Sequence, residues 1–246
     1  MQVGLIGAGN MGSALARGWG RPVLATDGGS GRAQALVDEL GGSVPGSNAE
    51  LARQADLVVL AHKPAQLAAV AAEVAPHARR VVSVLGRTSL EDLRAAYPGA
   101  RVTRVEPNTP VARGAGTLAL AVDGAQDEDA EVVALLERLG TVVRVPEAQM
   151  SVAGGISGVG PAYVALLAEA WIDAAVKRGM PAGTAQRLVT GTIAGAAVLM
   201  GEQDTLAIRR GVTSPGGTTA RGLAALERGG VRAAFLAAMD DVVDFA

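Results

Sequence analysis

The sequence contains no cysteine among its 246 residues. The absence of thiols excludes disulfides, thiolate catalysis and cysteine-based metal sites. Histidine is almost as scarce, because His62 and His77 are the only two. A histidine-rich metal centre is therefore not expected either, and we predict that the protein binds no metal.

Aromatic residues are the next scarcity, at 2% of the chain. A hydrophobic core has to be built from alanine, valine and leucine instead. Apolar residues nevertheless reach 49%, which is ample for a folded core and argues against disorder.

The sequence also has a net charge close to zero and no long apolar run. The formal net charge is −2, and without a basic stripe we expect no nucleic-acid partner, whose phosphates need clustered lysine and arginine. The apolar start at residues 1–6 is too short for a signal peptide. No segment approaches the roughly 20 apolar residues that a membrane span needs. We therefore expect a soluble cytoplasmic protein without a membrane partner.

The first 146 residues alternate between short apolar runs and helical stretches. Strands are expected at 2–6, 22–26, 57–61, 81–85, 101–105, 117–122 and 142–145, and helices at 10–18, 32–40, 65–75 and 128–139. This alternation predicts a parallel, doubly wound α/β sheet whose strands are buried on both faces. We expect a Rossmann-like dinucleotide-binding domain over residues 1–146.

Residues 147–246 show almost no strand signal and form the second expected domain, which is all-helical. Helices are expected from Pro161 to Lys177 and over 184–200, and both are apolar nearly all round. Such helices must be buried, but a domain of about 100 residues has little interior to hide them. We expect a homodimer through these C-terminal helices, with a higher oligomer or a tight monomeric bundle as open alternatives.

A glycine-rich loop, Gly7–Gly12, reads G-x-G-x-x-G. It follows an expected strand and opens an expected helix, which is the context this motif requires. The first glycine makes the turn, the second admits a pyrophosphate, and the third lets the helix pack on the strand. The loop therefore predicts a dinucleotide site at a helix N-terminus.

Residues 27–32 do not decide between NADPH and NADH. Asp27 ends the second expected strand, where an acidic residue would hold an unphosphorylated ribose and favour NAD. Ser30 and Arg32 follow closely, and an arginine fork suits a 2′-phosphate. We expect NADPH, with NADH as the alternative.

A second loop, residues 213–219, precedes an expected helix at 220–227. A glycine pair flanked by hydroxyl side chains at a helix start predicts a small-anion site, such as one for a carboxylate. The plainer alternative is a turn followed by a capped helix. No histidine or cysteine lies near either loop, so a ketone substrate would lack the usual proton donor. An imine needs less help, because positioning and exclusion of water suffice once it is protonated.

Four segments together resemble the pyrroline-5-carboxylate reductase family, in order and spacing, from residue 3 to about residue 240. They are residues 6–14, 104–110, 157–163 and 212–219. The resemblance implies NAD(P)H-dependent reduction of the cyclic imine acid 1-pyrroline-5-carboxylate to L-proline, the last step of proline biosynthesis. It also implies a helical C-terminal domain that interlocks with a partner subunit.

The resemblance also implies roles for individual residues at the substrate. Ser214 and Thr219 are expected to hold it, and the backbone at Gly217 and Thr218 to grip its carboxylate. The Thr219 hydroxyl would lie near the imine nitrogen. Glu202 would approach the substrate across the dimer and stabilise an iminium. Thr219 and Glu202 are thus the candidate catalytic residues.

For the cofactor, the resemblance places the turn after the strand at 57–61 beside the nicotinamide ribose, and Asn48 near the adenine ribose. The expected cofactor-binding residues are Gly7, Ala8, Gly9, Asn10, Met11, Ser30, Arg32, Asn48, Ala61, Lys63 and Pro64. The chain departs from the family at His62, where a small apolar residue is usual, and at Glu106, where a neutral one is common. The roles of these two residues stay open.

Three other functions have to be weighed. A β-hydroxyacid dehydrogenase should carry a catalytic lysine in the helical domain, but the only lysine there, Lys177, adjoins Arg178 at an expected helix end. A reductase of a related six-membered imine is not separable, because one methylene is worth only about 1–3 kcal/mol. A non-catalytic nicotinamide sensor would need the first loop but not the second.

Overall fold

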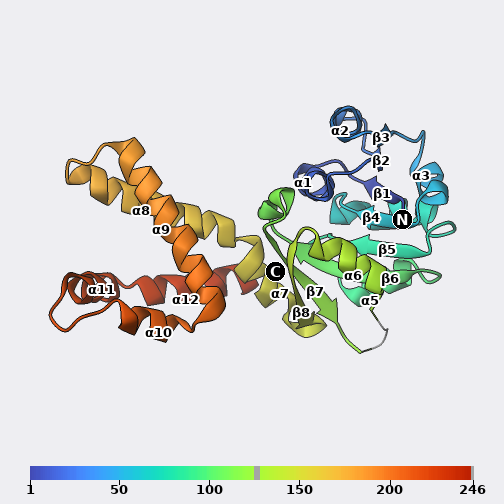
Figure 1. Ribbon diagram of the computed structural model, residues 1–246. Coiled ribbons are helices and arrows are strands. Elements are labelled where there is room, and N and C mark those ends of the chain that lie inside the picture. Colours follow the sequence, from blue (N-terminus) through green and yellow to red (C-terminus); the bar gives the residue numbers. More distant parts are fainter. Residues whose placement is uncertain (125–127, 245–246) are drawn as a thin grey trace. The chain divides into compact units, whose positions relative to one another are not determined.

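The computed structural model describes residues 1–124 and 128–244. Contacts divide the chain into two compact units, and the division falls between Pro161 and Ala162. The first unit is built on a sheet, and the second contains helices only (Figure 1).

The eight strands of the first unit form one sheet. They are β1 Val3–Ile6, β2 Val23–Thr26, β3 Gly42–Ser43, β4 Leu57–Leu60, β5 Arg80–Ser83, β6 Arg101–Pro107, β7 Gly116–Val122 and β8 Gly140–Pro146. Their order across the sheet is β3-β2-β1-β4-β5-β6-β7-β8. Chain order reverses beside β1, which is where open α/β sheets bind ligands at the carboxyl ends of their strands. The Rossmann-like doubly wound architecture expected from the sequence is confirmed.

One pair of strands departs from the expected parallel arrangement. β6 pairs with β7 in the antiparallel sense, with Val105 opposite Leu120, whereas β7 and β8 are again parallel. The connection at 108–115 holds only the 3-10 helix η2, Thr109–Arg113. A parallel crossover needs a dozen or more residues, so this short link forces β7 to run back along β6.

Helices cover both faces of the sheet. They are α1 Asn10–Trp19, α2 Arg32–Leu40, α3 Asn48–Gln54, α4 Leu67–Val74, α5 Leu90–Ala96, α6 Ala130–Glu137 and α7 Met150–Ala153, with 3-10 helices η1 Pro64–Gln66 and η3 Glu147–Gln149 and the π-helix η4 Gly154–Gly158. Helices α3 and α5 were not expected from the sequence, because both are short. At the start of α3, Ser47 accepts from the Glu50 N–H. At the start of α5, Ser89 accepts from the Asp92 N–H and the Asp92 carboxylate accepts from the Ser89 N–H.

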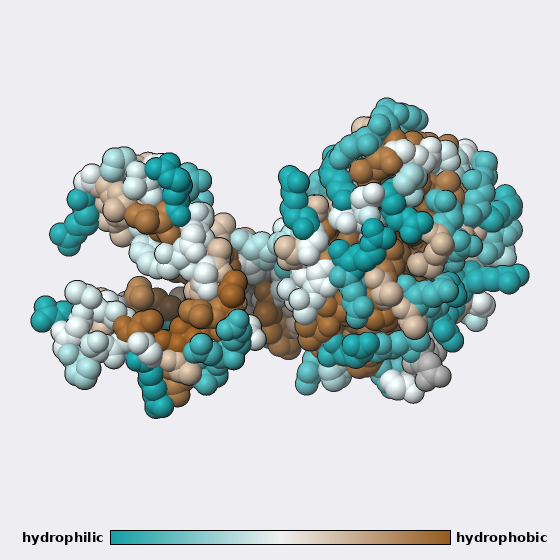
Figure 2. Space-filling model, in the orientation of Figure 1, coloured by the Kyte–Doolittle hydropathy of each residue, from teal (hydrophilic) through white to brown (hydrophobic). Residues whose placement is uncertain are grey.

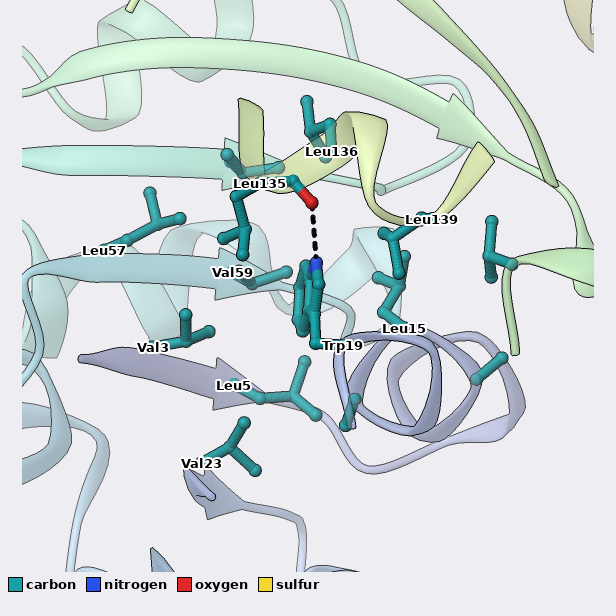
Figure 3. Close-up of a cluster of buried hydrophobic side chains, with 14 of the residues drawn as sticks. Val3, Leu5, Leu15, Trp19, Val23, Leu57, Val59, Leu135, Leu136 and Leu139 are labelled. Atoms are coloured by element: carbon teal, nitrogen blue, oxygen red, sulfur yellow. Dashed lines mark hydrogen bonds between the residues drawn. The ribbon is translucent and has the colours of Figure 1, made fainter. Parts of the chain in front are cut away.

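A hydrophobic cluster on each face of the sheet forms the core. On one face, Trp19 at the end of α1 lies among leucine and valine side chains from β1, β4 and α6 (Figure 3). Its Nε1–H donates to the carbonyl of Leu135, 3.1 Å away and 116 residues further along the chain. On the other face, Tyr97 packs with Leu51 and Leu93. The expected core of alanine, valine and leucine thus holds two of the few aromatic residues.

The second unit consists of helices with few buried residues among them. They are α8 Gly160–Lys177, α9 Ala182–Glu202, α10 Thr205–Gly211, α11 Thr218–Arg228 and α12 Val231–Asp244. Of their described residues, only Ala185 and Val189 are buried. Leu166, Val198 and Leu236 are each 65% exposed or more, and Figure 2 shows hydrophobic residues on the visible face of this unit. An apolar surface of this extent marks an interaction site.

One helical run, Glu147–Lys177, is long and apolar enough to cross a membrane by length and composition. The expectation that no segment reaches that length and hydropathy is therefore wrong. Scattered polar residues such as Glu169 interrupt the run in the sequence but leave it apolar on average. Length and composition alone do not distinguish such a run from a helix that a protein partner covers.

Candidate cofactor and substrate sites

A cavity of about 570 Å³ opens at the carboxyl ends of β1, β2 and β4. All eleven residues expected to bind the cofactor line it, from Gly7 in the first loop to Pro64 in η1. The cavity wall also includes residues that were not on that list: Ile6, Asp27, Gly28, His62, Gln66, Val70, Val84, Leu85 and Gly86. The structure thus brings together side chains and backbone from five separate segments of the sequence.

The three glycines of the first loop each meet a different steric demand. Gly7 has a φ of +105°, and a Cβ on it would lie 2.5 Å from the Ala61 carbonyl carbon. A Cβ on Gly12 would lie 2.1 Å from the Gly7 carbonyl oxygen, so this glycine lets α1 approach the strand. A Cβ on Gly9 would meet nothing within 4 Å. The space in front of Gly9 fits a pyrophosphate at the N-terminus of α1, which no described side chain caps.

Asp27 at the end of β2 is already engaged with its own loop. Its carboxylate accepts hydrogen bonds from the Gly29 N–H at 2.8 Å, the Ser30 hydroxyl at 2.8 Å and the Ala33 N–H at 3.0 Å. These bonds, that from Ala33 above all, hold the pKa of Asp27 below its ordinary value. The carboxylate therefore has little capacity left for ribose hydroxyls.

Arg32 begins α2 and is exposed at the rim of the cavity. Its guanidinium forms no ion pair with any of the described residues. A free guanidinium beside an engaged carboxylate suits a 2′-phosphate better than a bare ribose.

The turn after β4 forms the part of the cavity wall next to the glycine loop. The Ala61 N–H donates to the Ile6 carbonyl at 2.8 Å, which joins this turn to the glycine loop. Pro64 begins η1, and the Lys63 N–H donates to the Gln66 side chain at 3.2 Å. His62 Nδ1 lies 2.9 Å from the Lys63 carbonyl oxygen, and burial lowers the pKa of the His62 imidazole.

The second loop, in the helical unit, precedes α11. This helix starts at Thr218, two residues before the expected start, so Thr218 and Thr219 lie in its first turn. Gly216 has a φ of +71°, and the Gly217 N–H donates to the Ser214 carbonyl at 3.0 Å. Gly217 is the N-cap, and α11 has no side-chain cap. In the described chain the loop is therefore not a hydroxyl-capped helix start. The Gly217 N–H and the Thr213 hydroxyl donate to backbone carbonyls, whereas the hydroxyls of Ser214, Thr218 and Thr219 have no partner among the described residues and stay available to an anion.

Glu202 is the last residue of α9 and is exposed, as are Ser214 and Thr218. Thr219 and Gly217 are partly exposed. The residues expected at the substrate thus lie in two segments of the helical unit, the end of α9 and the loop that leads into α11. Both segments are open to the surface.

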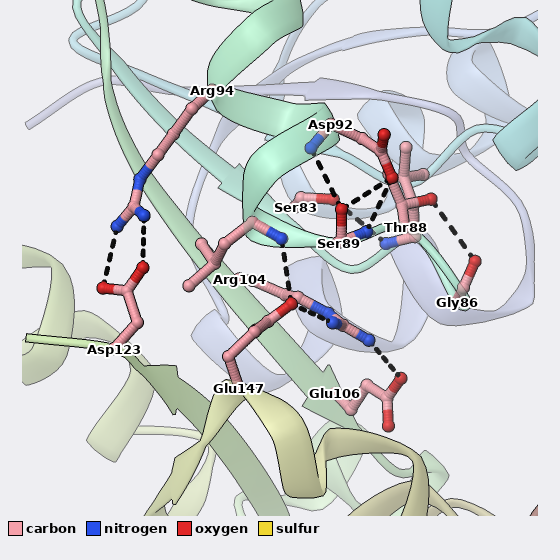
Figure 4. Close-up of polar contacts among 12 residues, drawn as sticks. Ser83, Gly86, Thr88, Ser89, Asp92, Arg94, Arg104, Glu106, Asp123 and Glu147 are labelled. Carbon is pink, nitrogen blue, oxygen red and sulfur yellow. Dashed lines mark hydrogen bonds and ion pairs between the residues drawn. The ribbon is translucent and has the colours of Figure 1, made fainter. Parts of the chain in front are cut away.

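A partly buried ion cluster joins Arg104 and Glu106 of β6 to Glu147 of η3 (Figure 4). Arg104 is 7% exposed, and its Nη1 lies 2.5 Å from Oε1 of Glu147, which also accepts from the Leu90 N–H at 2.9 Å. Its Nη2 lies 3.4 Å from Glu106. Burial raises the pKa of Glu106 despite this arginine. Glu106, one of the two family departures, is therefore part of a structural ion cluster.

The same end of β6 fixes the π-helix η4. A Cβ on Gly154 would lie 2.5 Å from Glu106 Oε2. The Asn108 amide donates to the Ser157 carbonyl at 3.1 Å, and its oxygen accepts from the Thr117 N–H at 2.9 Å. The run at 107–110 thus attaches η4 to the sheet. Within residues 1–124 and 128–244, no group of three or more histidines and carboxylates is placed to hold a metal ion.

Comparison with known proteins places both units in one family. Residues 147–246 match the family model for pyrroline-5-carboxylate reductase dimerisation, and residues 2–87 match that for NADP oxidoreductase, coenzyme F420-dependent. The pyrroline-5-carboxylate reductase of Synechocystis is 40% identical over 78% of this chain and 74% of its own length. Pyrroline-5-carboxylate reductase 3 of Mus musculus is 37% identical over 97% and 92%.

Solved structures give the same assignment. The Plasmodium falciparum pyrroline carboxylate reductase with NADP bound superposes with a TM-score of 0.85 at 28% identity, over 99% of this chain and 96% of that one. The pyrroline-5-carboxylate reductase of Coxiella burnetii superposes with a TM-score of 0.87 at 30% identity, with the same coverage. These likenesses extend through the glycine loop, both units and the loop before α11. The chain belongs to the pyrroline-5-carboxylate reductase family.

Proposed function

We propose that this protein reduces 1-pyrroline-5-carboxylate to L-proline with NADPH, as the last step of proline biosynthesis. The observation that carries the proposal is the pairing of a complete dinucleotide cavity with an uncapped hydroxyl-rich helix start, in a chain of this family. Reduction of a C=N bond requires one hydride at carbon and one proton at nitrogen. NADPH supplies the hydride when it is bound.

The cavity residues provide the cofactor site in this proposal. The N–H groups at the start of α1 hold the pyrophosphate in front of Gly9, where there is space for it. Arg32 holds the 2′-phosphate beside Ser30, whose hydroxyl donates to Asp27, and Asn48 lies at the adenine ribose. Ala61, Lys63 and Pro64 line the nicotinamide half. The engagement of Asp27 within its own loop supports NADPH over NADH.

The loop before α11 provides the substrate site. The substrate carboxylate binds at the backbone of Gly217 and Thr218. The Thr218 N–H is the donor, because the Gly217 N–H already donates to the Ser214 carbonyl, and the Ser214 hydroxyl assists. The positive end of the α11 macrodipole stabilises this anion. The Thr219 hydroxyl, in the first turn, orients the imine nitrogen, and its oxygen accepts a hydrogen bond from the N–H of the protonated imine. Glu202 from the partner subunit stabilises the protonated imine, which already accepts hydride without a histidine or cysteine.

The helical unit forms a homodimer in this proposal. Exposed apolar residues along α8, α9 and α12, among them Leu166, Val198 and Leu236, need a partner surface. The dimerisation family model spans the same helices. We place the start of this functional domain at residue 147, where that model begins, although contacts divide the chain after Pro161. A self-paired helical face needs no lipid, and a cytoplasmic location is part of the proposal.

Oxidation of NADPH by the purified protein in the presence of 1-pyrroline-5-carboxylate tests the proposal. We expect substrate-dependent loss of the absorbance of the reduced nicotinamide and formation of L-proline. Parallel assays with NADH and with the six-membered cyclic imine acid measure cofactor and ring preference. Absence of substrate-dependent oxidation with either cofactor would exclude the reductase function and leave a dinucleotide-binding protein.

A further inference from the structure

His62 has no role in the proposed function, but it has three features that indicate one. It follows β4 at the carboxyl edge of the sheet and lines the cofactor cavity. Its Nδ1 is 2.9 Å from the Lys63 carbonyl oxygen. Its Nε2 is buried and has no hydrogen-bond partner in the described part of the chain.

The first contact determines which nitrogen carries the proton. A carbonyl oxygen only accepts, so Nδ1 must donate, and the neutral ring then has its lone pair on Nε2. Burial lowers the pKa of His62 and so favours this neutral form. A shielded acceptor without a donor is costly, and such groups in native proteins usually have a ligand or an unseen partner.

The chemistry of the cofactor restricts what can pair with Nε2. The pyrophosphate and the 2′-phosphate offer only acceptors at neutral pH, whereas the ribose hydroxyls, the carboxamide of the nicotinamide and the amino group of the adenine donate. His62 lies next to the pyrophosphate loop, because a Cβ on Gly7 would be 2.6 Å from the His62 backbone nitrogen. A sugar attached to the pyrophosphate is thus the part of the cofactor within reach.

The order of the strands indicates which sugar it is. β1 lies between β2 and β4 in the sheet. The loop after β2 contains Ser30 and leads to Arg32 at the start of α2, and these residues are assigned to the adenosine ribose and its phosphate. Because β4 lies on the other side of β1, it lies on the nicotinamide side. We propose that His62 is a cofactor-positioning residue whose Nε2 accepts a hydrogen bond from a hydroxyl of the nicotinamide ribose. Nε2 is shielded in the free protein, so binding includes a local movement that opens Nε2 to the cavity while Nδ1 keeps its bond to the Lys63 carbonyl.

This inference rests on the proposed NADPH-dependent function and concerns how the same site holds its cofactor. A matched pair of substitutions separates the two ring nitrogens. His62→Asn places an amide N–H near Nδ1 and retains the bond to Lys63, but it has no group at the position of Nε2. His62→Gln extends an amide oxygen toward Nε2. Far-UV circular dichroism and the urea unfolding midpoint establish that both variants are folded.

The readout is the dissociation constant of NADPH, measured by cofactor fluorescence without turnover. The loss of one neutral hydrogen bond predicts about 3- to 10-fold weaker binding for His62→Asn, and affinity within about 2-fold of the parent for His62→Gln. Adenosine 2′,5′-bisphosphate, which lacks the nicotinamide ribose, should bind the parent and His62→Asn equally well. In turnover, the KM for NADPH should rise while kcat stays within about 2-fold.

Unchanged NADPH affinity in His62→Asn would overturn the inference, as would an equal loss for adenosine 2′,5′-bisphosphate. Equal losses in His62→Asn and His62→Gln would do so too, because they would show that the ring acts by packing and not through Nε2. These measurements do not depend on the imine substrate. If the protein binds NADPH but does not reduce 1-pyrroline-5-carboxylate, the proposed function fails while the role of His62 is still decided.

Discussion

Replacement of Gly9 by alanine separates the binding role of the glycine loop from its structural role. A Cβ at this position meets nothing within 4 Å in the described chain. Gly9 has a φ of −72°, which alanine adopts without strain. A methyl group there would nevertheless occupy the space where we place the pyrophosphate. Gly9→Ala should therefore weaken cofactor binding while leaving the fold intact.

The size of each effect follows from the geometry. Alanine loses the slight N-cap advantage of glycine but gains a comparable amount from the unfolded state. The free energy of unfolding should therefore change by no more than about 0.5 kcal/mol. A hydrogen bond to a charged phosphate is worth about 1.5–3 kcal/mol. Displacing the pyrophosphate enough to break one such bond should weaken NADPH binding by about 10- to 150-fold.

Gly12→Ala is the matched control, because its Cβ would lie 2.1 Å from the Gly7 carbonyl oxygen. Backbone atoms cannot easily move away, and overpacking of this kind costs about 1–3 kcal/mol of stability. Urea unfolding followed by circular dichroism and titration with NADPH should be run on both variants. If Gly9→Ala bound NADPH as tightly as the parent, the pyrophosphate would not lie at the start of α1.

Three further substitutions test the core, the substrate loop and the dimer. Trp19→Phe removes the donor to the buried Leu135 carbonyl and should lower the free energy of unfolding by about 1–3 kcal/mol; an unchanged urea midpoint would show that this bond contributes nothing. Thr219→Ala should lower kcat at least about tenfold, by loss of a hydrogen bond to a charged imine, with NADPH affinity unchanged; loss of NADPH affinity alone would contradict our placement of the substrate. Leu188→Glu puts a charge on the 56% exposed side chain on α9 and should dissociate the dimer in analytical ultracentrifugation, and an unchanged sedimentation coefficient would place the interface elsewhere.

The glycine loop of the cofactor cavity was predictable because its determinants are local. The steric roles of Gly7 and Gly12 depend on a strand, a tight turn and a helix within ten residues, and the motif encodes all three. Asn48, Lys63 and Pro64 line the same cavity from other segments and were expected only from the family resemblance. Asp27 was less predictable. Its residue type suggests ribose binding, but its hydrogen bonds to Gly29, Ser30 and Ala33 depend on how the loop folds back.

Other features depend on contacts that sequence periodicity does not record. The two residues of β3 are too few to show alternation. The antiparallel β6–β7 pair depends on the length of the link at 108–115. Arg104, Glu106 and Glu147 form one cluster although they are spread over more than 40 residues, and from the sequence Glu106 was only an unexplained departure. The roles of Glu202 and Thr219 involve a second subunit and a substrate, so they stay predictions.

The bond between Trp19 and Leu135 has a consequence for how the chain is made. Domains generally fold as units while synthesis proceeds from the N-terminus. The glycine loop and α1 leave the ribosome before α6, because the carbonyl that fixes the end of α1 lies 116 residues further along the chain. A nascent chain that stops before α6 therefore carries the complete nucleotide-binding motif on a helix that is not yet anchored. Ribosome-bound chains should become resistant to proteolysis near α1 only after Leu135 has emerged.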